Sequence, residues 1–266
     1  MFAVGAAAAA RIGVARYALA QVMVTASQLT AHYVNEYADV DADQAVANRT
    51  MFSGGSGVLV SGGLGAGVAL QAAFVTTGLS VAAAVAVGAS APLTAGLGLV
   101  TLAVSWAYSI PPVRLLGTGW GELATSLTVA GLVPLIGVTS MGSSPSEALW
   151  WAVGILVPIH VAMMLVFELP DLESDALVGK RVLAVRLGEE RTRAFASGLL
   201  AAAAATGVAA DGSDAISGAT WAVVAGVVPA AVLLSAMRQR QYGTMTAAAV
   251  ATLVVVAAGL LVAIAS

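Results

Sequence analysis

The chain has little charge and no cysteine. Only 9% of its 266 residues are charged, whereas a soluble domain carries about 25%. The absence of cysteine excludes disulfides and thiolate metal sites, and the two histidines, His32 and His160, lie far apart and fit no zinc pattern. The net charge of −3 and the lack of a basic face argue against nucleic-acid binding.

Long apolar runs are abundant in place of charge. The chain is 59% hydrophobic with a mean hydropathy of +0.94, which is typical of a polytopic membrane protein. No soluble segment is long enough for a second domain, so we expect one transmembrane domain over residues 1–266. Backbone polar groups in lipid must be satisfied within each segment, so the predicted fold class is an all-α transmembrane bundle.

The apolar runs predict eight full membrane spans. Their ranges are 12–37, 62–87, 92–108, 121–139, 147–169, 190–209, 217–236 and 244–264. A spanning helix needs about 20 residues, so the apolar segment Met1–Ala10 is interpreted as the stub of a helix or as an interfacial segment. At the start of the second span, Gly63 and Gly67 predict close packing between helices.

Basic residues lie in alternate loops. Nine of the eleven are Arg49, Arg114, Lys180, Arg181, Arg186, Arg191, Arg193, Arg238 and Arg240, in or beside the loops after the first, third, fifth and seventh spans. The loops between them carry none. The positive-inside rule therefore places these four loops in the cytoplasm. We expect an integral protein of a prokaryotic plasma membrane.

Half of the acidic residues gather in two clusters, each where a long apolar run ends. The cluster at residues 35–43 holds four of the fourteen, and the cluster at residues 171–175 holds three. Carboxylates are costly near hydrocarbon, so such clusters at the mouth of a bundle indicate a functional site. Both clusters lie on the predicted cytoplasmic side.

The spacing within each cluster is four residues. Asn35, Asp39 and Asp43 therefore face one direction on a helix, and Asp171 and Asp175 repeat that spacing. Hard cations take oxygen ligands, and Mg²⁺ is commonly held by carboxylates together with substrate phosphates. Two such stripes facing each other could bind two or more Mg²⁺ ions and a diphosphate. Helix-end solvation is the simpler alternative.

Basic residues accompany both clusters. Arg49 follows the first, Lys180 and Arg181 follow the second, and Arg114 lies in a loop between them. Arg through its planar fork and Lys as a point charge could neutralise a departing pyrophosphate. Anchoring of the cytoplasmic loops would also explain most of these residues.

Other residues near the clusters receive lesser roles. Asp41 and Glu173 lie off the two stripes, so they are predicted to be solvated or to support the ligands. The glycine-rich segment 52–57 lacks the Lys-Ser/Thr ending of a P-loop, and we interpret it as a connector near the site.

Together these residues resemble the UbiA superfamily of intramembrane prenyltransferases. Asn35, Asp39 and Asp43 match its Asn-x-x-x-Asp-x-x-x-Asp motif, and Asp171 and Asp175 match its Asp-x-x-x-Asp motif. Segments 108–115 and 179–188 resemble its cytoplasmic loop and the continuation of its second motif. The resemblance covers roughly residues 15–265.

The resemblance implies a nine-helix bundle around a central cavity and Mg²⁺-dependent ionisation of an allylic prenyl diphosphate. The carbocation then alkylates an acceptor, often an aromatic ring, and pyrophosphate leaves. The implied catalytic and metal-binding residues are Asp39, Asp43, Asp171 and Asp175, with Asn35 as a further metal ligand. The implied substrate-binding residues are Asn35, Arg49, Tyr108, Arg114, Lys180 and Arg181.

Within the superfamily, segments 117–122 and 179–181 look most like menaquinone-pathway enzymes that prenylate 1,4-dihydroxy-2-naphthoate. Two departures leave the acceptor open. Pro112 stands where some branches have lysine, and Phe167–Pro170 stands where the menaquinone branch often has Asn and Arg.

Two other functions remain as alternatives. A UbiA-type terpene synthase would ionise the same diphosphate and cyclise the cation on its own chain. A transporter is disfavoured because transporter sites usually lie near the midplane, whereas these clusters lie at helix ends on one side. The sequence predicts neither donor length nor oligomeric state.

Overall fold

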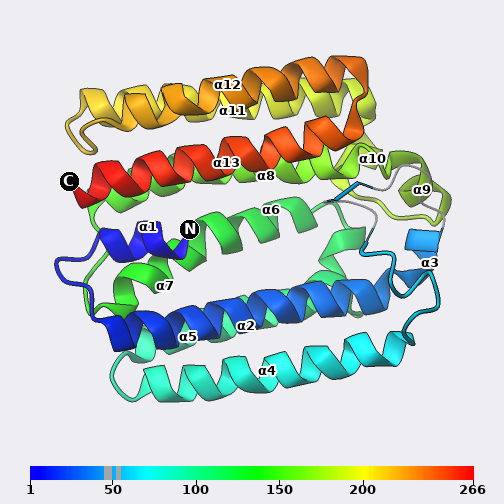
Figure 1. The fold of residues 1–266 in the computed structure, drawn as a ribbon, viewed down its shortest axis with the longest axis horizontal. Coiled ribbons are helices and arrows are strands. Elements are labelled where there is room, and N and C mark those ends of the chain that lie inside the picture. The colour runs from blue at the N-terminus through cyan, green and yellow to red at the C-terminus, as the bar shows by residue number, and fades with distance from the viewer. Residues whose placement is uncertain (45–49, 52–54) are drawn as a thin grey trace. The chain divides into compact units, whose positions relative to one another are not determined.

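A computed structural model describes residues 1–44, 50–51 and 55–266, and the regular secondary structure of these residues is helical (Figure 1). No strand occurs in this part of the chain, so the predicted all-α class is confirmed. The helices are α1 (Phe2–Ala7), α2 (Val14–Ala38), α3 (Val40–Gln44), α4 (Ala66–Gly88), α5 (Pro92–Ser109), η1 (Leu115–Gly117), α6 (Gly121–Leu127), η2 (Thr128–Leu132), α7 (Val133–Ser140), α8 (Glu147–Glu168), α9 (Leu172–Leu177), α10 (Leu183–Leu187), α11 (Glu189–Gly212), α12 (Ala219–Gln239) and α13 (Tyr242–Ala265).

The helices form two compact units. Of the described residues, unit 1 holds 1–44 and 55–145, with α1 to α7, and unit 2 holds 50–51 and 146–266, with α8 to α13. Each unit carries one acid cluster at the C-terminal end of a long helix, α2 in unit 1 and α8 in unit 2. The two halves of the chain therefore repeat one arrangement of a long helix followed by carboxylates.

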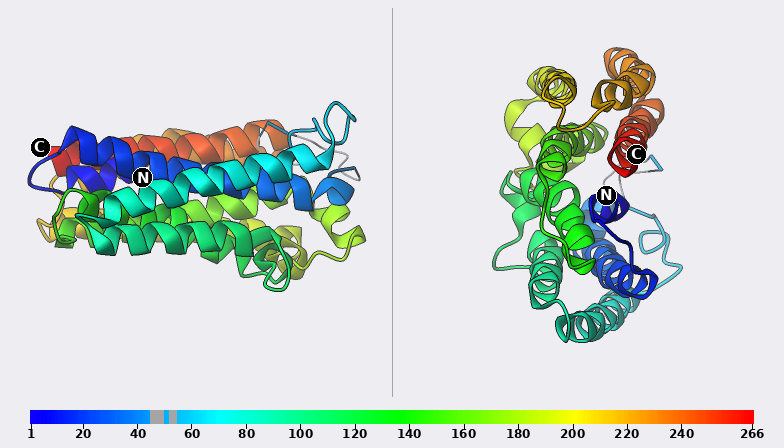
Figure 2. Two further views of the ribbon diagram at one scale, coloured as in Figure 1. Left: turned by 90° about the horizontal axis from the view of Figure 1, so that it is seen from below. Right: turned by 90° about the vertical axis from the view of Figure 1, so that its left-hand side faces the viewer.

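Unit 1 is organised around α2. This helix packs along α4, its neighbour in blue and cyan in Figure 2, and also against α5. The hydroxyls of Ser27 and Ser80 lie 2.8 Å apart, as do those of Thr30 and Thr76. Lipid supplies little hydrophobic drive between helices, so small residues and hydroxyl pairs of this kind hold α2 to α4.

The N-terminal segment forms the short helix α1, which packs on α7. Phe2, Val4 and Ala6 are buried, and the Phe2 ring meets Tyr17 edge to face at 5.0 Å. A Cβ on Gly137 of α7 would overlap the Phe2 backbone oxygen, so glycine permits this approach. Most of this short helix is buried within unit 1, and both interpretations of Met1–Ala10, a stub and an interfacial segment, stay predictions.

Unit 2 brings α8 against α11 and α13, and α12 against α13. Glycines allow the close contacts: a Cβ on Gly207 would overlap Val223, and one on Gly226 would overlap Val256. The prediction for Gly63 and Gly67 is wrong. Gly63 precedes the first turn of α4, and nothing lies within 4 Å of a Cβ at Gly67.

Six segments of the described chain are long and apolar enough to cross a bilayer. They are α4, Gly121–Ser140, α8, α11, α12 and α13. Helices α2 and α5 also coincide with predicted spans, but they are not among these six. The prediction of a helical membrane protein is confirmed, and the count of eight full spans stays a prediction.

Candidate functional site

The first acid cluster straddles the end of α2. The helix ends at Ala38, Asp39 is its C-cap with φ −106° and ψ 8°, and α3 begins at Val40. The helical hydrogen bonds nevertheless continue: Asp39 N donates to Asn35 O at 2.9 Å, and Asp43 N donates to Asp39 O at 2.8 Å. The backbone therefore keeps the four-residue register although the α-helix is interrupted.

Asn35 connects this cluster to the end of α5. Its Nδ2 donates to Asp39 Oδ2 at 2.8 Å and to Ser109 Oγ at 3.4 Å. Because a carboxylate only accepts hydrogen bonds, the amide NH2 must face Asp39, and the amide oxygen lies on the other branch. Asp39 is only 7% exposed. The bond from Asn35 partly replaces the water that its carboxylate loses on burial.

The loop after α5 lies at the same end of unit 1. Ser109 ends α5, and the ring of its neighbour Tyr108 lies against Gly121 at the start of α6, where a Cβ would sit 3.0 Å from Tyr108 Cε2. Arg114 adopts a left-handed backbone with φ 41°, and its N–H donates to Ile110 O at 3.0 Å. Its side chain is exposed. The Asn35–Ser109 hydrogen bond thus places the end of α5, where this loop begins, beside the first acid cluster.

The connector after α3 returns to this cluster. Glu36 accepts hydrogen bonds from Ser56 N at 2.6 Å and from Ser56 Oγ at 2.8 Å. A Cβ on Gly55 would overlap the Asp43 carboxylate, so the Gly55 backbone lies directly against that side chain. Gly55 and Ser56 of the glycine-rich segment therefore lie beside the first acid cluster, and the interpretation of the segment as a connector near the site stays a prediction. Residues 52–54 and Arg49 lie outside the described residues.

The second acid cluster follows α8. Asp171 is the N-cap of α9, and Asp175 N donates to Asp171 O at 2.8 Å, so the four-residue register is helical here too. Asp175 is buried and Asp171 is half-buried. Asp41 and Glu173, which lie off the stripes, are both exposed, as expected for solvated residues.

Lys180 folds back onto Asp175. Its Nζ lies 3.3 Å from Asp175 Oδ1, and its backbone N–H donates to Asp175 O at 2.9 Å. Gly179, with φ 75°, makes this reversal possible because a left-handed backbone costs glycine little. Both side chains of the ion pair are largely buried. Arg181, the next residue, is exposed.

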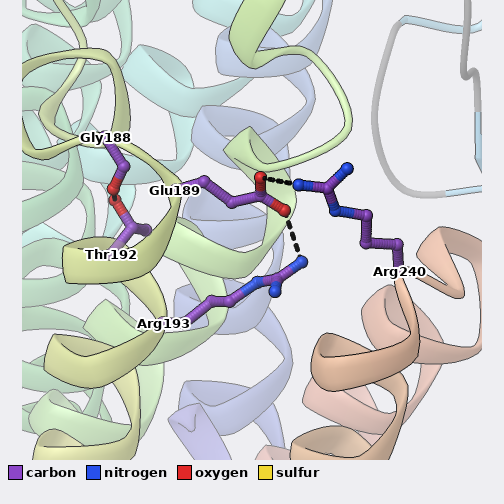
Figure 3. Close-up of polar contacts among 5 residues, drawn as sticks. All are labelled: Gly188, Glu189, Thr192, Arg193 and Arg240. Carbon is purple, nitrogen blue, oxygen red and sulfur yellow. Dashed lines mark hydrogen bonds and ion pairs between the residues drawn. The ribbon is translucent and has the colours of Figure 1, made fainter.

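Further arginines meet at one end of unit 2 (Figure 3). Glu189, in the first turn of α11, accepts from Arg193 and from Arg240 Nη2, the latter at 2.7 Å. Arg240 follows α12, so this contact ties the start of α11 to the end of α12. Two of the loops predicted to be cytoplasmic therefore share one end of unit 2.

A protein family and a solved structure match nearly the whole length of this chain. The model of the UbiA prenyltransferase family matches residues 1–254. The chain belongs to the UbiA prenyltransferase family. A solved structure, the apo structure of a UbiA homolog from Aeropyrum pernix K1, matches with a TM-score of 0.78 at 16% identity, covering 98% of this chain and 94% of that chain. At this identity the likeness shows the fold. A search of curated proteins finds no match.

Membership of the UbiA family establishes the general reaction. Members transfer a prenyl group from a prenyl diphosphate to an acceptor, and they generally use a divalent metal. This UbiA-family chain is therefore a membrane-embedded prenyltransferase at the level of its family. The family match does not distinguish between branches of the family, so the menaquinone branch stays a prediction.

Each acid cluster of this UbiA-family chain carries oxygen donors of the kind that suits a hard cation. Carboxylates of Asp39, Asp43, Asp171 and Asp175 and the amide oxygen of Asn35 are the oxygen ligands that Mg²⁺ takes in proteins. Among the described residues, no group of three or more His, Cys, Asp or Glu side chains lies close enough to hold a metal ion by itself. The prediction that the two stripes face each other stays a prediction.

Sequence reasoning missed three polar residues of these regions. Glu36 and Ser56 form the contact described above, and Glu168 accepts a hydrogen bond from Ala184 N at 3.2 Å while only 8% exposed. Glu168 thereby fixes the first turn of α10 beside the second cluster. The available signal was a carboxylate next to each motif, since Glu36 directly follows Asn35 and Glu168 precedes Asp171 by three residues.

Proposed function

We propose that this protein transfers the prenyl group of an allylic prenyl diphosphate to an aromatic acceptor in a Mg²⁺-dependent reaction that releases pyrophosphate. One observation carries the proposal. Two carboxylate pairs of four-residue spacing, Asp39 with Asp43 and Asp171 with Asp175, each keep a helical register in the folded chain. Each pair also has a nitrogen donor attached, from Asn35 in one case and from Lys180 in the other.

The metal ligands we propose are Asn35, Asp39, Asp43, Asp171 and Asp175. When bound, divalent cations supply positive charge to the diphosphate and so favour its departure. The protein also supplies a positively charged side chain, Lys180, in the loop after the second acid cluster. Lys180 Nζ lies 3.3 Å from Asp175 Oδ1, so its positive charge is held beside a proposed metal ligand, where it can attract the diphosphate.

Arg114 and Tyr108 are proposed to bind the diphosphate from the loop after α5. The left-handed backbone of Arg114 projects its exposed side chain out of a tight turn, where a guanidinium can form two parallel hydrogen bonds to phosphate oxygens. Arg181 is exposed beside Lys180 and is given the same role. Arg49, outside the described residues, is retained as a further candidate.

The proposed reaction breaks the allylic C–O bond of the diphosphate and forms a bond from the allylic carbon to the acceptor ring. Both electrons of the C–O bond leave with pyrophosphate, the ring donates an electron pair to the carbocation, and the ring then loses a proton. Lys180, Arg114 and Arg181 serve the first step because negative charge grows on the leaving oxygen there. We place this chemistry at the cytoplasmic ends of the spans.

For the acceptor, we propose 1,4-dihydroxy-2-naphthoate, in line with a menaquinone-pathway role. This rests on the likeness of segments 117–122 and 179–181 to that branch. Within that first segment, Gly121 packs against the Tyr108 ring and Glu122 is buried in the first turn of α6.

The test uses purified protein with Mg²⁺, labelled prenyl diphosphates of several lengths and a panel of aromatic acids. We expect pyrophosphate release and a prenylated naphthoate by mass spectrometry. Asp39→Ala and Asp175→Ala should each abolish the product while the protein remains folded by circular dichroism. Absence of pyrophosphate release with every donor, in a folded sample, contradicts the proposal. A cyclic hydrocarbon formed without an acceptor would identify a terpene synthase instead.

A further inference from the structure

Glu36 lies inside the first acid motif, but its carboxylate does not join Asn35 and Asp39. One residue step rotates a helix position by about 100°, so Glu36 points away from the stripe. Its two oxygens accept from Ser56 N at 2.6 Å and from Ser56 Oγ at 2.8 Å. Both hydrogen-bond donors of one residue, twenty positions along the chain, thus converge on one carboxylate.

The backbone around Ser56 is shaped for this contact. Gly55 and Gly57 have φ values of 67° and 76°, so Ser56 is flanked by two left-handed residues. Val58 N donates to Ser56 Oγ at 3.2 Å, which orients the hydroxyl so that its proton points to Glu36. The turn therefore presents Ser56 as a preformed receptor for a carboxylate.

The same turn lies against the side chain of Asp43, a proposed metal ligand. Gly55 precedes Ser56 directly, and its backbone lies so close to Asp43 that a Cβ would overlap the carboxylate. Whatever holds Ser56 therefore also fixes the backbone that restricts the Asp43 side chain. Glu36 is the described charged residue that holds Ser56.

We infer that Glu36 is a positioning residue: through Ser56 it keeps the Gly55 turn against Asp43 and so preorganises Asp43 to bind a divalent cation. The inference rests on the proposed function, in which Asp43 is a metal ligand. Without Glu36 the turn loses a charge-assisted anchor, and the Asp43 carboxylate gains rotamers that do not bind metal. Because the contact is partly exposed, we expect a loss of about three- to tenfold in cation affinity.

The test measures cation binding directly, without turnover. Free Mn²⁺ is followed by electron paramagnetic resonance in the presence of inorganic pyrophosphate, for the full chain and for Glu36→Gln, Ser56→Ala and the double variant. We expect weaker Mn²⁺ binding in each single variant. The double variant should bind no more weakly than the weaker single variant, because both changes remove one contact. Ser61→Ala, which removes only a hydroxyl bonded to Val58 O in the same loop, is the matched control.

A further variant changes Gly55, whose backbone lies against Asp43. Gly55→Ala leaves Glu36 and Ser56 unchanged but forces the backbone away from Asp43, and it should weaken Mn²⁺ binding as well. Unchanged Mn²⁺ affinity in folded Glu36→Gln, or fully additive effects of Glu36→Gln and Ser56→Ala, would overturn the inference.

Turnover separates positioning from a general structural role. In Glu36→Gln the Mg²⁺ concentration needed for half-maximal rate should rise, and kcat at saturating Mg²⁺ should change much less. A purely structural defect would lower kcat and leave the Mg²⁺ dependence unchanged. Wild-type protein that binds Mn²⁺ with pyrophosphate but transfers no prenyl group would refute the proposed function alone. Equal Mn²⁺ affinity in wild type and Glu36→Gln, with prenyl transfer intact, would refute the role of Glu36 alone.

Discussion

Asp175 and Lys180 form an ion pair in which Nζ lies 3.3 Å from Oδ1 and both side chains are at most 10% exposed. The two residues are joined by a second contact, because the backbone N–H of Lys180 also donates to Asp175 O. A cation five residues after the last motif aspartate is therefore held against that aspartate by the local backbone. Lys180, one of the predicted phosphate-binding residues, therefore has its ammonium group fixed beside a motif aspartate.

Lys180→Met should impair both stability and binding of the prenyl diphosphate. The substitution removes a 3.3 Å ion pair from a largely buried carboxylate, which costs about 1–3 kcal/mol. The free energy of unfolding in mixed micelles and the KM for the donor would be measured together. Lys180→Arg keeps the charge and should restore most of the stability. Wild-type stability and KM in Lys180→Met would contradict this role.

Asn35→Asp should be more harmful than Asn35→Ala. The first substitution replaces the NH2 that donates to Asp39 by a second carboxylate, so like charges meet where a 2.8 Å hydrogen bond stood. We expect prenyl transfer to fall by at least about tenfold relative to Asn35→Ala. Ser109→Ala removes only the longer 3.4 Å contact and should have a small effect on rate. Initial rates at fixed Mg²⁺ compare the three variants.

The spacing within each motif was readable from the sequence because helical register is local. Asn35, Asp39 and Asp43 keep their order even where α2 stops at Ala38, since the backbone bonds continue. The Glu36–Ser56 contact was not readable. It joins residues twenty positions apart through a turn that depends on two left-handed glycines, and no periodicity reports such a path.

The fold shows the same division. The hydropathy of the sequence predicted where the long helices lie, because an apolar run in lipid must satisfy its backbone hydrogen bonds within itself. It did not predict which helices pair, since Ser27 meets Ser80 across 53 residues and Thr30 meets Thr76 across 46. Gly137 and Gly226, which permit close packing, lie in apolar sequence much like that around Gly67. A Cβ at Gly67 would have nothing within 4 Å, so the sequence alone does not distinguish these glycines.

Gly137→Ala should destabilise the protein by displacing α1 from α7. The added Cβ would overlap the backbone of Phe2, and neither backbone can yield without moving a helix, so we expect a cost of about 1–3 kcal/mol. Gly131→Ala is the matched control in the preceding turn, because nothing lies within 4 Å of its Cβ. Thermal unfolding in detergent compares the two. Equal melting temperatures would contradict the packing of α1 described here.

Arg240→Ala and Arg193→Ala should differ in cost although both remove a partner of Glu189. The Arg240 side chain is 65% exposed, so its ion pair is worth at most about 1 kcal/mol and should weaken in high salt. Arg193 is 22% exposed and bonds Glu189 within the first turn of α11, so its loss should cost more and depend less on salt. Unfolding at low and high ionic strength separates these contributions. A larger and salt-independent loss in Arg240→Ala would mean that the tie from α12 to α11, rather than the helix start itself, stabilises this end of unit 2.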